Sequence, residues 1–249
     1  MTAGEVSRFF LCADTNRRVC YNRRMREICF KCLRPKDTCF CRFLTPFDPG
    51  VKFVFLMHPK EAKRQRTGTG RIAHAGLIDS EIIVGIDFTK NARLNELLGD
   101  PRYYPVLLYP GDEAWTAQTE GFKEEIGNRK LLAIIIDSTW FCSKKMLRFS
   151  PNITSLPKLS FSGGYESIFT FKREPKPEYI STIESCYYLI KELQSAGIVP
   201  QTDCECLMTA FKEMIKFQIQ KENDRIEGKI PNTHATDFKY TRLKEMPKF

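Results

Sequence analysis

The stretch LLAIIID at residues 131–137 is the part of the sequence that decides the fold. Six consecutive apolar residues run directly into a carboxylate, Asp137. An apolar run without polar alternation is typical of a strand that is buried on both faces. Four other segments have the same character and predict further strands, at 51–57, 82–88, 104–109 and 158–161, and residues 167–172 are a sixth candidate.

Segments with helical spacing lie between these apolar runs. Short helices are expected at 71–77, 91–98 and 143–149, and two longer ones at 179–196 and 204–222. The first long helix places Ile180, Ile183, Tyr187 and Ile190 on one face and ends before Gly197. Strands that alternate with helices predict an α/β domain with a mostly parallel sheet covered by helices on both faces. We expect this domain at residues 49–249, after an N-terminal arm at residues 1–48.

Composition and charge limit the class of protein. The 249 residues carry 39 Lys and Arg against 30 Asp and Glu, which gives a net charge of +9. This balance favours a polyanionic partner, most often nucleic acid, although many basic surfaces are simply solvated. No apolar run approaches the roughly 20 residues that cross a bilayer, and the first residues do not resemble a secretory signal. The expectation is a cytoplasmic protein, with a monomer favoured.

Four of the ten cysteines lie within thirteen residues of each other. They are Cys29 and Cys32, a C-x2-C pair, followed by Cys39 and Cys41, a C-x-C pair. Two close thiolate pairs can converge on Zn²⁺ in a tetrahedron, and a site with four protein ligands is structural. The alternatives are four reduced thiols or two disulfides, and disulfides are disfavoured in a reducing compartment. The other cysteines are expected to be small buried side chains.

Two polar segments follow predicted strands, where parallel sheets bind their ligands. One is Tyr109-Pro110-Gly111-Asp112 and the other is Asp137-Ser138-Thr139-Trp140. Asp, Ser and Thr are also good helix N-caps, so capping is the alternative explanation of the second segment. A tryptophan beside a strand-end carboxylate is unusual in a chain with two tryptophans, and this favours a binding site.

Taken together, these motifs resemble the DTW-domain family, which is named for its Asp-x-Thr-Trp motif. The resemblance spans about residues 29–188. Besides Asp137-Ser138-Thr139-Trp140 it rests on the four cysteines, His58-Pro59 with Glu61, Thr69-Gly70-Arg71, Leu107-Leu108-Tyr109-Pro110, Lys145-Met146-Leu147 before Ser150-Pro151, and Ser181-Thr182-Ile183-Glu184. The chain departs from the family at Gly68, where Asn is usual, and at Lys172, where Arg is usual and where the adjacent Arg173 is a substitute candidate.

The resemblance implies a tRNA-uridine aminocarboxypropyltransferase. Such enzymes transfer the 3-amino-3-carboxypropyl group of S-adenosylmethionine to N3 of uridine and release 5′-methylthioadenosine. It also implies a relationship to the SPOUT class, whose sheet carries a trefoil knot near the cofactor. The alternatives are a SPOUT-type RNA methyltransferase and a non-enzymatic zinc-knuckle RNA-binding protein.

The chemistry assigns roles to the matched residues. Asp137 is the first candidate for the base that accepts the N3 proton and Glu184 the second, although Glu184 can also pair with a nearby cation or simply lie on a helix face. Trp140 stacks on a base or walls the pocket. The segments expected to bind S-adenosylmethionine are Leu108, Tyr109, Pro110, Gly111, Thr139, Trp140, Leu159, Ser160, Ser181 and Thr182.

A basic segment at residues 58–74 is the expected tRNA contact. It carries cations around glycines that let a phosphate approach the backbone, and a solvated basic loop is the alternative. Its candidates, together with those near the second departure from the family, are Lys60, Lys63, Arg64, Arg66, Thr69, Arg71, Lys172 and Arg173. A second arginine group stands beside the cysteines, at Arg17, Arg18, Arg23, Arg24 and Arg26.

Overall fold

The computed structural model describes residues 27–64, 67–169, 179–231, 245–247 and 249. Its centre is a five-stranded sheet in the order β2-β1-β4-β3-β5, and every pair of neighbouring strands is parallel. The strands are β1 (Lys52–Met57), β2 (Ser80–Val84), β3 (Tyr103–Leu108), β4 (Lys130–Asp137) and β5 (Lys158–Leu159). The expected α/β fold with a parallel sheet is therefore confirmed.

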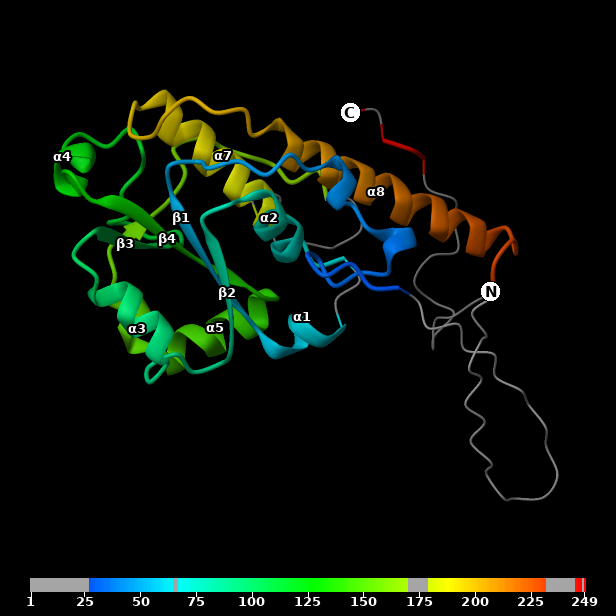
Figure 1. Cartoon of the computed structure of the whole chain (residues 1–249), viewed down its shortest axis with the longest axis horizontal. Helices are drawn as coiled ribbons and strands as arrows, with labels where there is room; N and C mark the ends of the chain where they lie inside the picture. The colour runs from blue at the N-terminus through cyan, green and yellow to red at the C-terminus, as the bar shows by residue number, and fades with distance from the viewer. Residues whose placement is uncertain (1–26, 65–66, 170–178, 232–244, 248) are drawn as a thin grey trace, which may run out of the picture.

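Helices cover both faces of the sheet (Figure 1). One face carries α2 (Gly70–Gly76), α7 (Thr182–Ser195) and α8 (Glu205–Ile226), and the other carries α3 (Ala92–Gly99), α5 (Trp140–Phe149) and α6 (Pro151–Thr154). Two short helices, α1 (Pro59–Arg64) and α4 (Phe122–Ile126), lie at the ends of strands. No helix in the described ranges is both long and apolar enough to span a membrane.

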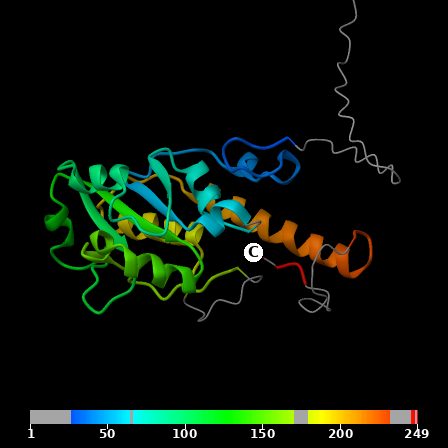
Figure 2. The ribbon, with the colours of Figure 1, turned by 90° about the horizontal axis from the view of Figure 1, so that it is seen from below.

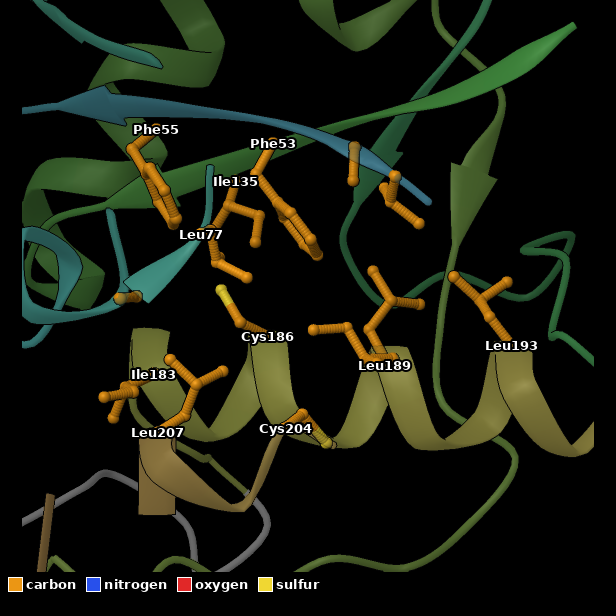
Figure 3. Packing of buried hydrophobic residues seen from close by; sticks show 14 of the residues in the cluster. Phe53, Phe55, Leu77, Ile135, Ile183, Cys186, Leu189, Leu193, Cys204 and Leu207 are labelled. Atoms are coloured by element: carbon orange, nitrogen blue, oxygen red, sulfur yellow. The ribbon is translucent and has the colours of Figure 1, made fainter. Parts of the chain in front are cut away.

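Alternation along the strands produces two hydrophobic cores. On β1, Phe53 and Phe55 pack toward α7 and α8, whereas Val54 and Leu56 pack toward α3 and α5. Figure 3 shows the first core, in which Phe53 and Phe55 of β1 face Cys186 and other apolar side chains of α7. A strand flanked by two cores has no polar face, and this explains the continuous apolar run of LLAIIID.

Most predicted elements are present with shifted ends. The strand expected at 82–88 is β2 (Ser80–Val84), because its pairing with β1 ends where Met57 stands opposite Val84. The sixth strand is wrong for residues 167–169, which are not in a strand, and residues 170–172 lie outside the described residues. The helices α1, α4 and α6 were not expected; each has six residues or fewer, too few to show a periodicity.

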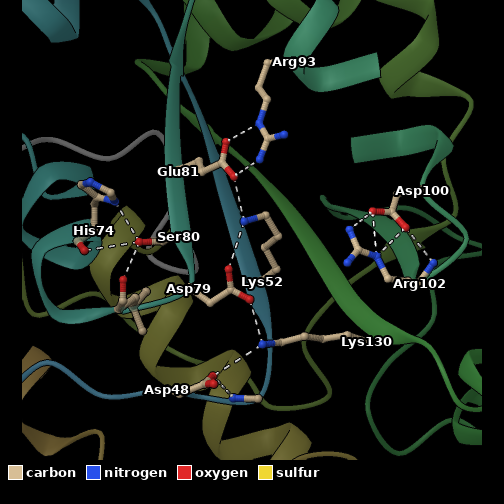
Figure 4. Close-up of polar contacts among 12 residues, drawn as sticks. Asp48, Lys52, His74, Asp79, Ser80, Glu81, Arg93, Asp100, Arg102 and Lys130 are labelled. Carbon is tan, nitrogen blue, oxygen red and sulfur yellow. Dashed lines mark hydrogen bonds and ion pairs between the residues drawn. The ribbon is translucent and has the colours of Figure 1, made fainter. Parts of the chain in front are cut away.

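An ion-pair network joins the amino ends of three strands (Figure 4). Lys52 Nζ on β1 lies 3.0 Å from Asp79 Oδ1 and 2.8 Å from Glu81 Oε1, and Lys130 of β4 binds the other oxygen of Asp79 at 2.8 Å. Arg93 of α3 completes the network through Glu81. The network lies at the end of the sheet opposite to Asp137, so it bears on stability and not on the candidate site.

The four-cysteine segment packs beside α8, as Figure 2 shows from below. Phe40 forms an edge-to-face contact with Phe217 of α8, with ring centroids 5.8 Å apart. Arg34 also reaches α8, where its guanidinium lies 3.4 Å from the sulfur of Met214. The described part of the N-terminal arm therefore belongs to the same packed body as the sheet.

Candidate active site and metal centre

Asp137 ends β4, the central strand of the five, and lies opposite Met57 at the end of β1. The chain leaves β1 toward β2 and leaves β4 in the other direction, toward β5, so the two connections diverge at this edge. Such a switch point is where open parallel sheets bind ligands. The peptide N–H of His58 donates to the carbonyl of Asp137 at 3.1 Å and holds the two strand ends together.

Two other motifs converge on the Asp137 carboxylate. The hydroxyl of Thr182, the first residue of α7, donates to Asp137 Oδ1 at 2.7 Å. Gly70, the first residue of α2, is so close that a Cβ added to it would lie 2.3 Å from Asp137 Oδ2. Asp137 itself is 6% exposed. The structure thus brings together the Asp-Ser-Thr-Trp, Thr-Gly-Arg and Ser-Thr-Ile-Glu motifs at one carboxylate.

Ser181 and Glu184 form the start of α7. The peptide N–H of Ser181 donates to Glu184 Oε2 at 2.7 Å, which is one of the two bonds of a capping box. The hydroxyl oxygen of Ser181 is buried and forms no hydrogen bond with the described residues. A buried hydroxyl with unused hydrogen-bonding capacity beside Thr182 is suited to a polar ligand group.

The Glu184 carboxylate is fully buried and accepts two more hydrogen bonds. Ser167 Oγ donates to Oε2 at 2.7 Å, and the peptide N–H of Ile168 donates to Oε1 at 2.8 Å. Its catalytic role stays a prediction, since these contacts give it a structural task. It anchors the loop after β5 to the start of α7.

A second buried carboxylate, Glu192, anchors the same loop two turns further along α7. Its Oε1 accepts the peptide N–H groups of Ser162 and Gly163 and the hydroxyl of Tyr165, each at 3.0 Å. Burial and this hydrogen bond raise the pKa of Tyr165 to about 12. Glu192 is not among the site residues predicted from the sequence. An isolated Glu in a helix has no spacing that distinguishes it from a surface residue.

Aromatic side chains line the strand ends next to Asp137. Trp140 stacks on Tyr179 with ring centroids 3.9 Å apart, and Tyr109 lies at a tilt, 6.4 Å from Trp140. Thr139 caps α5 by accepting the Cys142 N–H at 3.4 Å, so the capping explanation holds for this residue. Burial raises the pKa of the Tyr109 hydroxyl, which keeps it neutral.

The segments expected to bind the cofactor come from neighbouring strands. The peptide N–H of Tyr109, after β3, donates to the carbonyl of Leu159 in β5 at 3.0 Å. Ser160 donates its peptide N–H to the carbonyl of Trp115 at 2.7 Å. Leu108, Pro110 and Gly111 follow the same edge. These segments therefore share one end of the sheet with Thr139, Trp140, Ser181 and Thr182, as predicted from the parallel topology.

The residues expected to contact tRNA fall into different environments. Lys60 and Lys63 are exposed on α1, whereas Thr69 is buried. The guanidinium of Arg71 donates a hydrogen bond to the carbonyl of Ala62 at 3.4 Å. Arg64 lies in the last turn of α1. The remaining candidates lie outside the described residues: Arg66, Lys172, Arg173 and the N-terminal group Arg17, Arg18, Arg23, Arg24 and Arg26.

The four thiols of Cys29, Cys32, Cys39 and Cys41 gather into one cluster, with all sulfurs within 4.8 Å of one another. The sulfurs of Cys29 and Cys41 are 3.9 Å apart and those of Cys32 and Cys39 are 3.6 Å apart. A tetrahedron with metal–sulfur bonds of about 2.3 Å has sulfur–sulfur edges of about 3.8 Å. The spacing fits Zn²⁺ and is far longer than a disulfide bond of about 2.05 Å.

The surroundings of three of these thiols shift their pKa values in different directions. Hydrogen bonding from the peptide N–H of Cys32 lowers the pKa of Cys29 to about 6, whereas burial raises the pKa of Cys32 to about 11. Burial also raises the pKa of Cys41. A cation that binds four thiolates must therefore displace protons from the buried ones, and a divalent metal does this by charge.

Arg34 connects this cysteine cluster to the candidate site. Its guanidinium donates to the carbonyl of Gly68 at 3.1 Å and stacks 5.4 Å from the ring centroid of Phe40. Gly68 stands two residues before Gly70, which touches Asp137. The four-cysteine segment thus supports the loop that packs against the carboxylate.

Comparison with known proteins bears on the family of this chain. The DTW domain model matches residues 26–219. The chain is similar to tRNA-uridine aminocarboxypropyltransferase 2 of Drosophila melanogaster, with 28% identity over 214 residues that cover 83% of this chain and 79% of the fly protein. No solved structure matches the chain. Because the family model matches most of its length, the chain belongs to the DTW domain family.

Proposed function

We propose that this protein is a tRNA-uridine aminocarboxypropyltransferase that uses S-adenosylmethionine and modifies N3 of a tRNA uridine. The observation that carries the proposal is the convergence of the family motifs on Asp137 at the switch point of the sheet. The similarity to the fly enzyme supports the same reaction class. A relationship to the SPOUT class, with its knotted chain, is part of the proposal.

The residues around Asp137 fit S-adenosylmethionine. The Ser181 hydroxyl is buried with unused hydrogen-bonding capacity, which suits the amino or carboxylate group of the donor. The stacked rings of Trp140 and Tyr179 offer an apolar wall for an adenine or uracil ring. When bound, the donor supplies the 3-amino-3-carboxypropyl group and its sulfur takes up the bonding electrons on leaving.

Asp137 is proposed as the base that accepts the N3 proton of uridine. Thr182 fixes the orientation of the carboxylate by its hydrogen bond to Oδ1, and Gly70 lies against Oδ2, so the carboxylate is held at the strand end where the uridine would bind. Proton transfer of this kind contributes roughly 100- to 10,000-fold in rate. Glu184, with three hydrogen bonds, is proposed to hold the loop and the start of α7 in place.

Zn²⁺ is the proposed occupant of the four-cysteine cluster, held by Cys29, Cys32, Cys39 and Cys41. With four thiolates the metal has no open position for a water or substrate, so its role is structural. Through Arg34 it stabilises the loop that carries Gly68 and Gly70.

The decisive experiment is transfer itself. Purified protein is incubated with S-adenosylmethionine and bulk tRNA that lacks the modification, and the digested nucleosides are analysed by mass spectrometry. A uridine that is heavier by one aminocarboxypropyl group, together with released 5′-methylthioadenosine, supports the proposal. A methylated nucleoside with S-adenosylhomocysteine points to an RNA methyltransferase, and tRNA binding without any product points to a binding protein.

A further inference from the structure

The outer face of α5 carries cations and aromatic rings that are exposed to solvent. Cys142, Ser143 and Met146 bury the inner face of the helix. The exposed side chains, which we call the α5 basic face, are Phe141, Lys144, Lys145, Arg148 and Phe149. Phe141 is 84% exposed and Phe149 is 43% exposed, so two aromatic rings face solvent on this helix.

Within the described ranges, the cations of α5 lack the acidic partners that cations on α3 and α8 have. On α8, cations pair with acids one turn away, as in Lys216 with Glu213 at 2.8 Å and Arg225 with Glu222 at 2.7 Å. Arg93 of α3 pairs with Glu81 and Glu96. The segment WFCSKKMLRF of α5 contains no acid, and its three cations form no ion pair within the described part of the chain. The outer face of α5 therefore carries three positive charges that the described residues do not neutralise.

Two of the three cations lie near one ring, and one of these two, Lys145, also acts on the strand end that precedes α1. Lys145 Nζ lies 5.8 Å and the Arg148 guanidinium carbon 6.0 Å from the centroid of Phe149. Burial, and then the positive charges of Lys60 and Lys145, lower the pKa of His58, which stands at the end of β1. Lys60 of α1 and Lys145 of α5 therefore act on the same point of the sheet edge from two elements.

The position of the α5 basic face indicates which partner it binds. Helix α5 begins at Trp140, three residues after Asp137, so a polymer that places a base at Asp137 must run its neighbouring phosphates past one of the adjacent helices. Lysine and arginine without acid partners attract a phosphate backbone, and an exposed ring stacks on an unpaired base. We propose that the α5 basic face docks the backbone and a flanking base of the tRNA beside its target uridine. This rests on the proposed function.

The test compares two triple variants that remove equal charge. The first is Lys144→Ala, Lys145→Ala and Arg148→Ala. The control removes Lys123 of α4, which lies at the other end of the sheet, and Lys216 and Lys229, which are already ion-paired. All six side chains are half-exposed or exposed, so both variants should unfold at the temperature of the wild type. Binding of unmodified tRNA is measured by fluorescence anisotropy over a range of salt concentrations.

The α5 variant is expected to bind tRNA about tenfold more weakly or worse, with the slope of log K against log salt reduced by roughly 2–3. The control should stay within about twofold of the wild type. In the transfer assay the α5 variant should show a raised KM for tRNA and an unchanged kcat at saturation. Phe141→Leu should weaken binding by about tenfold without changing the salt slope.

Unchanged tRNA affinity in the α5 variant, or equal loss in the control, overturns the docking surface. That result would assign the face to a protein partner or to solvent. Failure of the proposed function gives a different result, because the wild type then binds tRNA without forming product while the binding comparison still decides the surface. A wild type that does not bind tRNA overturns both.

Discussion

The Thr182 hydroxyl donates a 2.7 Å hydrogen bond to Asp137 Oδ1, and this contact joins two motifs that stand 45 residues apart in the chain. Asp137 comes from the end of β4 and Thr182 from the first turn of α7. The hydrogen bond therefore fixes the orientation of the carboxylate at the end of β4. A carboxylate held in this way is suited to accept a proton from a bound substrate.

Asp137→Asn tests whether the charge of this residue is needed for catalysis. Asparagine has the same shape and keeps an oxygen that accepts the Thr182 hydrogen bond, so folding and tRNA binding should remain within about twofold of the wild type. Because the amide cannot take up the N3 proton, transfer should fall by roughly 100-fold or more. Single-turnover transfer with saturating tRNA measures this loss. Near-normal turnover would show that Asp137 only shapes the site.

Gly70→Ala tests the contact between α2 and the carboxylate. The added methyl group would meet Asp137 Oδ2 at 2.3 Å, so the helix or the carboxylate must move. We expect a loss of roughly 1–3 kcal/mol in unfolding free energy and a loss of transfer of at least about tenfold. The matched control is Gly99→Ala at the end of α3, where an added Cβ meets nothing within 4 Å. Equal behaviour of the two variants in urea unfolding and transfer would contradict the contact.

Glu184→Gln separates an anchoring role from a catalytic one. Three donors converge on the carboxylate, and the amide of glutamine would turn its own N–H groups toward one of them. Leaving one buried donor unsatisfied costs roughly 1–3 kcal/mol. Turnover of the folded variant, measured well below its Tm, should stay within a few-fold of the wild type. A large loss of turnover at unchanged stability would make Glu184 catalytic, and Glu213→Gln on α8 serves as the neutral control.

The sequence predicts the sheet well because burial on both faces leaves a visible apolar run, as in LLAIIID. The sequence does not predict α1, because PKEAKR has one apolar residue and therefore no apolar stripe along a helix face. The carboxylate at the strand end is predictable from local order. Its partners Thr182 and Gly70 are recognisable as motifs, but their meeting at Asp137 depends on how α7 and α2 pack. Glu192 gives no local signal, because its loop partners lie about 30 residues away.

Lys52→Met tests the ion-pair network at the amino ends of the strands. Hydrogen bonds from Arg93 and then Lys52 lower the pKa of Glu81 to about 2, and the pKa of Asp79 is also lowered, because its bonds with Lys130 and Lys52 outweigh the opposing effect of burial. Carboxylates with depressed pKa values stabilise the fold above their ordinary pKa values, and this contribution is lost as the pH falls toward about 2.

The variant should therefore be less stable than the wild type by roughly 1–3 kcal/mol at pH 6, and the difference should shrink steadily below about pH 4.5. Urea unfolding at several pH values measures it. Lys216→Met, which removes one surface pair with Glu213, should change stability by less than about 1 kcal/mol at any pH. A difference for Lys52→Met that stays constant from pH 6 to pH 3 would show that lost packing, and not the ion pairs, causes it.

Arg34→Met tests whether the four-cysteine cluster supports the site through the Gly68 carbonyl. Methionine keeps the apolar stem but loses the donors to Gly68 and to the sulfur of Met214. We expect a zinc content equal to that of the wild type, measured by mass spectrometry of the metal, together with a several-fold loss of transfer. Lys36→Met is the matched control, because Lys36 belongs to the same segment but only forms an exposed pair with Glu27.

Removing the metal from the wild type with a chelator should lower both Tm and transfer, since the segment that positions Arg34 then loses its cross-link. If chelation lowers Tm while Arg34→Met keeps full transfer, the metal stabilises the fold without reaching Asp137.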